Sequence, residues 1–256
     1  MNRRQFGTTS IAAALGASST TLTEAAGTAA SYYELRKYQL RRDFDTSHVN
    51  SFIENDFIPA MKSRGVGPIG CFGISTGNQS PSLIVLIQYK SLSEIITNTE
   101  LAAKDDAFTQ KWQSFETKQM PYVRYESSLL KAFAGHPGIE IPKARDGGHL
   151  FELRTYESKN GVASAAKIDM FNEEEIKIFR DCGMATVFFG EGVFANRLPH
   201  LTYMLAFEDV AHREATWKKF SSNADWNRIK NDARWLDTVS VIDSSFLTAT
   251  AYSEVR

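Results

Sequence analysis

The sequence has little net charge and no long run of basic residues. Its 256 residues carry 29 Lys and Arg against 30 Asp and Glu, which gives a formal net charge of −1. A nucleic-acid-binding protein needs a basic patch that neutralises phosphates. We therefore predict no nucleic-acid partner.

Cysteine is also scarce, because Cys71 and Cys182 are the only two. Two cysteines cannot build a disulfide framework. Cys71 falls in an expected strand and Cys182 near an expected helix end, so we expect two buried free thiols. A single bridge between them is the alternative in an oxidising compartment.

Metal-binding and nucleophile motifs are missing as well. No histidine pair has the spacing of a zinc site, no Gly-x-Ser-x-Gly elbow occurs, and Gly190-Glu191-Gly192 does not complete a dinucleotide fingerprint. We predict no metal and no cofactor, with the histidines solvated or satisfied by neighbours. The five histidines are His48, His136, His149, His200 and His212.

The apolar stretch at the N-terminus is short and mild. Asn2-Arg3-Arg4-Gln5-Phe6 resembles the twin-arginine export signature, and the Gly, Ala, Ser and Thr residues that follow are too few and too polar to span a bilayer. We predict that residues 1–30 are a twin-arginine signal peptide and that the mature protein is periplasmic or secreted. A disordered tail is the alternative.

One hexapeptide occurs twice. The first copy is Tyr33-Glu34-Leu35-Arg36-Lys37-Tyr38. A similar hexapeptide follows 118 residues later, Phe151-Glu152-Leu153-Arg154-Thr155-Tyr156. This period is too long for a solenoid and matches one small domain. We predict a duplicated domain, with copies at 31–134 and 149–252 and a linker rich in Gly and Pro at 135–148.

Each copy reads as strand, helix, two strands, helix and strand. In the first copy the strands are expected at 32–41, 69–75, 83–89 and 122–132, and in the second at 149–157, 185–190, 200–208 and 238–249. This βαββαβ order is the ferredoxin-like split, in which helices cover one sheet face and leave the other bare. We predict an α+β fold in which the two sheets pair as an α/β barrel within one chain, with the helices outside.

The repeated opening strand, a helix that contains Pro59 and ends at Gly65, and an aromatic helix before the last strand resemble NIPSNAP domains of the dimeric α/β-barrel superfamily. The resemblance covers 32–133 and 149–250, although the second copy has Lys177 in place of Pro59. The resemblance implies the fold but not the activity. Family members are linked to mitochondrial signalling and trafficking in animals, and the function of exported bacterial members is unsettled. Some relatives in the superfamily bind haem, but no histidine in this sequence is singled out as a ligand.

The repeated strands supply the candidate site. Alternation places Glu34, Arg36 and Tyr38 on one face, and likewise Glu152, Arg154 and Tyr156. We expect these six side chains inside the barrel, where the arginines bind an anionic ligand, the tyrosines orient it and a glutamate moves a proton. Alternatively, Glu and Arg satisfy each other and only set strand register.

Three functions remain open. The first is a protein that binds a small anionic or aromatic molecule, or a partner, with the barrel interior. The second, implied by the resemblance, is a cofactor-independent monooxygenase or isomerase that uses the same cavity. The third is a structural or interaction protein without a pocket, so whether the chain is an enzyme stays undecided. Because the fusion supplies the pairing within one chain, we expect a monomeric pseudo-dimer or a homo-oligomer, with no stable membrane span.

Overall fold

The computed structural model describes residues 30–42, 45–77, 80–117 and 122–256. The twin-arginine motif and nearly all of the predicted signal peptide lie outside these described residues, so export stays a prediction. Among the helices of the described residues, none combines the length and the apolar character that crossing a bilayer requires.

The first half has the βαββαβ order, with the first helix interrupted by a π-helical turn. Its elements are β1 (Tyr32–Gln39), α1 (Ser47–Phe52), the π-helical turn η1 (Ile53–Phe57), α2 (Ile58–Ser63), β2 (Ile69–Thr76), β3 (Ser82–Tyr89), α3 (Leu92–Ala103), α4 (Asp106–Thr117) and β4 (Arg124–Ala132).

The second half repeats this order. Its elements are β5 (Leu150–Glu157), α5 (Gly161–Met170), the π-helical turn η2 (Phe171–Glu175), α6 (Ile176–Asp181), β6 (Ala185–Phe194), β7 (His200–Phe207), α7 (Val210–Ser222), α8 (Ala224–Ile229), the 3-10 turn η3 (Ala233–Trp235) and β8 (Val241–Ala249).

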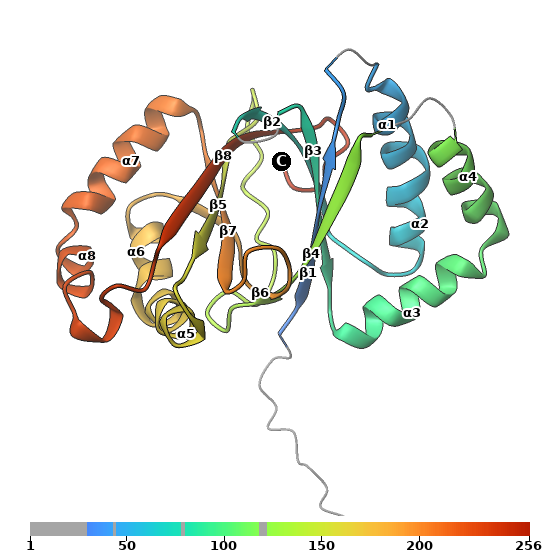
Figure 1. Ribbon diagram of the computed structural model, residues 1–256. Helices are drawn as coiled ribbons and strands as arrows, with labels where there is room; N and C mark the ends of the chain where they lie inside the picture. Colours follow the sequence, from blue (N-terminus) through green and yellow to red (C-terminus); the bar gives the residue numbers. More distant parts are fainter. Residues whose placement is uncertain (1–29, 43–44, 78–79, 118–121) are drawn as a thin grey trace, which may run out of the picture.

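All eight strands form one closed antiparallel barrel in the order β1-β3-β2-β8-β5-β7-β6-β4. The two halves join where β2 pairs with β8 and where β4 pairs with β6. The helices of the first half cover one flank of the barrel and those of the second half cover the opposite flank (Figure 1). The predicted α+β fold, with two paired repeats and outer helices, is confirmed.

The two π-helical turns occupy equivalent places in the two halves, since Ile53–Phe57 and Phe171–Glu175 lie 118 residues apart. The turn does not depend on proline. Pro59 lies at the start of α2, but the second half has Lys177 at the same place and forms the same turn. The π-helical turn is therefore a property of the repeat, and such turns occur often at functional sites.

The barrel interior is apolar and aromatic over part of its length. Tyr33 of β1 and Phe151 of β5, which open the two repeated motifs, are fully buried there. Tyr33 packs edge-on against Phe188, and Phe151 packs against Phe72. These side chains close one end of the barrel to ligands. The two cysteines, Cys71 and Cys182, are buried free thiols, as expected.

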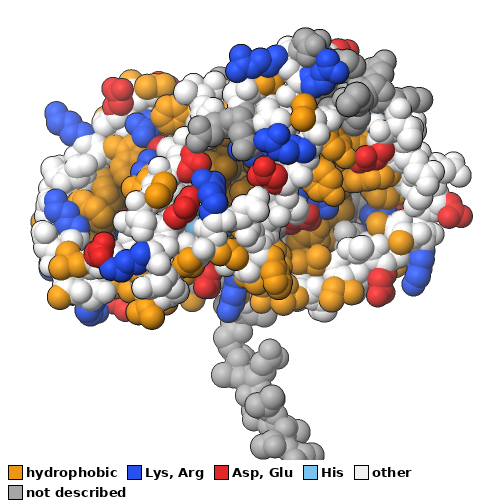
Figure 2. Space-filling view, in the orientation of Figure 1, with side chains coloured by type: hydrophobic (Ala, Val, Ile, Leu, Met, Phe, Trp, Pro, Cys, Tyr) orange, Lys and Arg blue, Asp and Glu red, His pale blue; other side chains and the backbone are white. Residues whose placement is uncertain are grey.

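The outer surface carries both charge signs without a large patch of either on the visible face (Figure 2). This distribution agrees with the formal net charge of −1. Mixed charge of this kind does not attract a polyanion.

Candidate functional site

The six predicted site residues face the helices and not the barrel interior. Tyr38 belongs to the core cluster that contains Val49 and Phe52 of α1. The Arg36 guanidinium lies 5.2 Å from the Phe57 ring centroid, and that of Arg154 lies 4.8 Å from the Trp217 ring centroid. The prediction that Glu34, Arg36, Tyr38, Glu152, Arg154 and Tyr156 project into the barrel is wrong.

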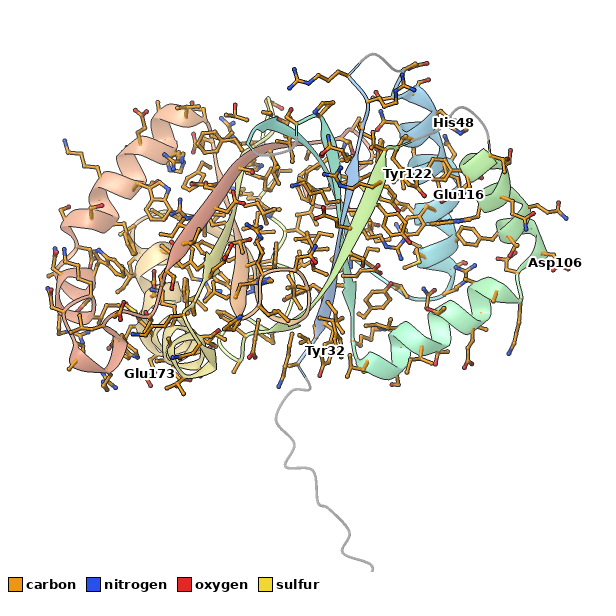
Figure 3. All side chains as sticks on the ribbon, viewed as in Figure 1. Tyr32, His48, Asp106, Glu116, Tyr122 and Glu173 are labelled. Atoms are coloured by element: carbon orange, nitrogen blue, oxygen red, sulfur yellow. The ribbon has the colours of Figure 1, made fainter. Side chains whose placement is uncertain are left out.

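The error has a physical reason. In a barrel covered by helices both faces of a strand are buried, so the more apolar face need not be the one that meets the helices. Here the apolar side chains of Tyr33 and Leu35 fill the barrel, while aromatic rings from the helices cover the charged face. Tyr122, which precedes β4 and is labelled in Figure 3, adds a ring that lies 5.3 Å from the ring of Tyr38.

In the first half, the glutamate and the arginine of the motif satisfy each other. Arg36 donates to both carboxylate oxygens of Glu34, at 2.5 and 3.0 Å, and Ser127 and Tyr89 donate at 2.7 and 3.2 Å. Burial alone would raise the pKa of Glu34, but the charge and hydrogen bonds of Arg36 lower it below its ordinary value. The alternative of mutual pairing on one strand face is therefore what the structure shows.

In the second half, Glu152 is fully buried and accepts hydrogen bonds from four residues. Arg154 donates at 2.6 Å, Arg213 donates twice at 2.8 Å, and Trp217 and Ser244 donate at 3.0 Å. Burial would raise the pKa of Glu152, but the hydrogen bonds from Arg213 and the charge of Arg154 hold it below its ordinary value. A carboxylate held in this way is a structural anchor between β5 and α7.

Next to this carboxylate lies a second polar group, which we call the outer cluster: Lys167, Glu175, Tyr156 and Tyr203. Lys167 Nζ lies 2.6 Å from Glu175 Oε2, and the side chains of both are at most 5% exposed. The hydroxyls of Tyr156 and Tyr203 lie 2.7 Å apart. Sequence reasoning missed this cluster.

The first half places apolar residues where the outer cluster has three of its polar ones. At an offset of 118 residues, Lys167, Glu175 and Tyr203 correspond to Val49, Phe57 and Val85, all of which are buried. Aligning the two halves residue by residue, rather than only at their opening motif, would have revealed this difference. The first half therefore folds without the three polar residues that the second half carries at these positions.

The barrel holds a cavity of about 580 Å³ at the end opposite Tyr33 and Phe151. This volume is in the range of small-molecule sites. Strands from both halves and the loop between β6 and β7 contribute the lining, which consists of Leu35, Lys37, Ile74, Ile84, Glu126, Ser128, Leu130, Leu153, Thr155, Asn196, Arg197, His200, Thr202, Asp243 and Ser245.

The cavity is layered along the strands. Nearest the opening lies a polar ring, in which Lys37 is paired in register with Glu126, and Thr155 with Asp243. Two residues deeper on each strand come the apolar side chains of Leu35 and Leu153, with Leu130 below them. A ligand in this cavity would meet charged and hydroxyl groups at the entrance and hydrocarbon at the floor.

The two halves contribute unequal groups to the polar ring. Glu126 corresponds to Asp243, which keeps a carboxylate on each side, but Lys37 corresponds to Thr155. The cavity therefore has one amine and no counterpart to it from the second half. The sequence analysis places Lys37 on the strand face opposite Arg36. A charged residue on the same face as Tyr33 and Leu35 was the available signal for a polar site inside the barrel.

In the described part of the chain, Lys37 Nζ has no hydrogen-bond or ion-pair partner within contact distance. Burial lowers the pKa of Lys37. The negative charges of Glu126 and Asp243 oppose this shift, and the positive charges of Arg197 and Arg124 add to it. The two nearby carboxylates have cations of their own, because Glu126 lies 3.6 Å from Arg124 and Asp243 lies 3.4 Å from Arg197. The amine is left available to a ligand.

The loop between β6 and β7 borders the opening. Arg197 has a φ of 61°, a left-handed backbone conformation that is uncommon outside glycine, and it pairs with Glu157 at 3.0 Å. The ring of His200 lines the same cavity, and its Nδ1 has no hydrogen-bond partner among the described residues. Burial lowers the pKa of His200, and the charge of Arg197 adds to the effect.

No group of three or more His, Cys, Asp or Glu side chains in the described ranges is arranged to hold a metal ion. The other histidines lie apart from one another. His48 is within 3.4 Å of the Phe115 carbonyl, His212 accepts from the Glu208 amide, and His136 is buried beside Glu140. His149 lies outside the cavity lining, against Phe151.

Comparison with known proteins finds a family match for the second half of the chain and a structural match for the barrel. The NIPSNAP family model matches residues 151–254. A protein from Lactobacillus acidophilus NCFM with a provisional monooxygenase name is 10% identical, with a TM-score of 0.58 over 86% of this chain and 94% of that chain. One from Fusobacterium nucleatum subsp. nucleatum ATCC 25586, also provisionally named a monooxygenase, is 13% identical, with a TM-score of 0.54 over 86% and 93% of the two chains. At these identities the likeness establishes the fold alone.

A further solved structure is half as long. A NIPSNAP family protein of unknown function from Agrobacterium tumefaciens strain C58 is 18% identical and covers 45% of this chain and 100% of that chain, with a TM-score of 0.39. A comparison with curated proteins finds no match.

Proposed function

The chain belongs to the NIPSNAP family, and from that premise we propose that it binds a small organic anion in the cavity of its fused barrel, with Lys37 as the cationic anchor. The observation that carries the proposal is the unpaired Lys37 amine in the polar ring of a cavity of about 580 Å³. A protonated, half-buried amine whose two nearby carboxylates are already paired with Arg124 and Arg197 gains from an anionic ligand.

The layering of the cavity defines the ligand further. Leu35, Leu153 and Leu130 offer hydrocarbon below the polar ring, so the ligand has an apolar or aromatic body and one acidic group. Thr155 and Thr202, whose hydroxyls lie 2.9 Å apart, add neutral hydrogen-bonding groups beside the amine. Aromatic carboxylates combine these features, so benzoate is a suitable probe.

We expect benzoate to bind the wild-type protein and raise its Tm, because a ligand that binds only the folded state stabilises it. Replacing Lys37 by Met should weaken benzoate binding at least about tenfold, or about 1.4 kcal/mol, because the anion loses its counter-charge. Isothermal titration calorimetry measures the affinity, and the melting curve of the free variant shows whether it still folds.

Lys104 provides the matched control, because it is exposed at the end of α3 and outside the cavity. The Lys104→Met variant should bind benzoate as the wild type does. Equal affinity of the Lys37→Met and Lys104→Met variants, or no binding to the wild type, contradicts the proposal.

An enzyme that uses the same cavity is the second candidate, and His200 is the observation that favours it. His200 lines the cavity, and its lowered pKa keeps the imidazole neutral near pH 7, as a proton acceptor must be. The provisional names of the two long structural relatives belong to those proteins, and the reaction of this chain is not inferred from them.

We also infer that the protein is exported through the twin-arginine pathway and works in the periplasm or outside the cell. Asn2-Arg3-Arg4-Gln5-Phe6 supports this inference, since the arginine pair is read by the export receptor. Replacing Arg3 and Arg4 together by Lys should retain the protein in the cytoplasm, which cell fractionation detects. Unchanged distribution of the double variant contradicts the export proposal.

A further inference from the structure

We infer that Lys37 is also a nucleophile, which forms a reversible imine with a small aldehyde or ketone held in the barrel cavity. This inference rests on the proposed function, because the carbonyl compound occupies the same cavity as the anion. It adds a covalent step and a second class of ligand, with the Lys37 amine as the reacting group.

The first support is that the amine is accessible and unengaged. Lys37 lines the cavity and has no hydrogen-bond or ion-pair partner among the described residues. Lys167 makes the contrast clear, since its amine is buried against Glu175 at 2.6 Å and cannot react. The second half has Thr155 at the position of Lys37, so the ring offers one nucleophile.

The second support is the pair of carboxyl groups around the amine. Glu126 is directly opposite Lys37 in the register of β1 and β4, and Asp243 stands in the same ring on β8. Imine formation needs groups that deliver and remove protons at the carbonyl oxygen. Both carboxyl groups line the same cavity as the amine.

The third support is the lowered pKa of the Lys37 amine. Burial lowers the pKa of Lys37, with the charges of Arg197 and Arg124 acting in the same direction and those of Glu126 and Asp243 against it. A larger share of the amine is therefore neutral near pH 7 than for an exposed lysine. Lowered lysine pKa values are a common device in Schiff-base sites.

The step is balanced without an oxidant or a metal. The nitrogen lone pair attacks the carbonyl carbon, the carbonyl oxygen takes a proton, and the nitrogen loses one, which gives a carbinolamine. A second proton then reaches the hydroxyl, water leaves, and the nitrogen lone pair forms the C=N bond of a protonated imine. The nitrogen then loses its remaining proton, which balances the one taken up by the hydroxyl. Amine and carbonyl become imine and water, and hydrolysis reverses the reaction.

The floor of the cavity fits such a ligand. Leu35 and Leu153 lie two residues, or about 6.6 Å, deeper than the polar ring. An aromatic aldehyde that places its ring there brings its carbonyl group to the level of Lys37. Benzaldehyde is the probe that meets this requirement and shares its ring with benzoate.

The test is reductive trapping. The purified protein is incubated with benzaldehyde and cyanoborohydride at pH 7, and the benzylated lysines are located by peptide mass mapping. We expect Lys37 to be modified at least about tenfold faster than the exposed Lys104 and Lys218, and we expect excess benzoate to protect Lys37 and leave these two unaffected. Modification of Lys37 no faster than that of Lys104, or without protection by benzoate, overturns the inference.

The Lys37→Arg variant removes the nucleophilic amine but keeps a positive charge. It should form no adduct at position 37, and the wild-type protein distinguishes the two proposals. If benzoate binds the wild type but Lys37 is not trapped preferentially, the imine is wrong and the proposed function stands. If neither benzoate binding nor preferential trapping occurs, both proposals fail.

Discussion

Replacing Lys167 by Met should destabilise the protein by about 3–5 kcal/mol, because the variant leaves the carboxylate of Glu175 buried without a partner. Lys167 and Glu175 are 5% and 2% exposed, and the amine also lies 4.8 Å from the Phe171 ring centroid. Methionine fills nearly the same volume, so the loss reports the charge and not a cavity. Denaturant unfolding measures the change in the free energy of unfolding.

The first half supplies the matched control for this experiment. The triple variant Lys167→Val, Glu175→Phe and Tyr203→Val introduces the residues that the repeat carries at Val49, Phe57 and Val85. Replacing a buried ion pair by apolar residues is often neutral or stabilising by about 1–4 kcal/mol. We therefore expect the triple variant to be at least as stable as the wild type. A triple variant as unstable as Lys167→Met would show that the polar cluster is required for folding.

Replacing Glu152 by Gln should cost a similar amount, about 3–5 kcal/mol at neutral pH. The substitution keeps the shape of the side chain but leaves the guanidinium groups of Arg154 and Arg213, which are 14% and 23% exposed, without their carboxylate. Glu34→Gln is the control in the first half. It should cost less, because Glu34 is 17% exposed and faces one arginine.

The same glutamate makes stability depend on acid. The folded-state pKa of Glu152 lies below that of the unfolded chain, so its contribution is complete above about pH 4.3 and is lost as the pH falls through the lower, folded value. The wild type should therefore lose stability in this acidic window faster than Glu152→Gln does. Parallel acid curves for the two proteins would contradict the role assigned to this carboxylate.

The fold could be predicted from the sequence because the signals for it are local and repeated. The motif at Tyr33 and Phe151 marks the start of each half, and the apolar spacing of the helices and strands gives the element order. A bare sheet face then requires a cover, which a second copy provides. Each of these arguments uses neighbours in the sequence or the repeat itself.

The site could not be predicted in the same way. Which face of β1 points inward depends on how two buried faces divide between barrel and helices, and alternation alone does not decide it. The cavity also forms only when β2 pairs with β8 and β4 pairs with β6, and Arg197 lies at its edge. The paired residues of these strands are at least 58 positions apart, so Lys37 became visible as a site residue only in the closed barrel.

The joining of both halves into one chain has a consequence for how such a cavity can evolve. When two identical subunits close a barrel, every mutation in the wall appears twice around the common axis, and a lysine in the ring would bring its own like-charged twin. A tandem gene removes that constraint. Each wall can then change alone, which permits a single amine beside Thr155 in this chain and a buried Lys167–Glu175 pair in only one of the two halves.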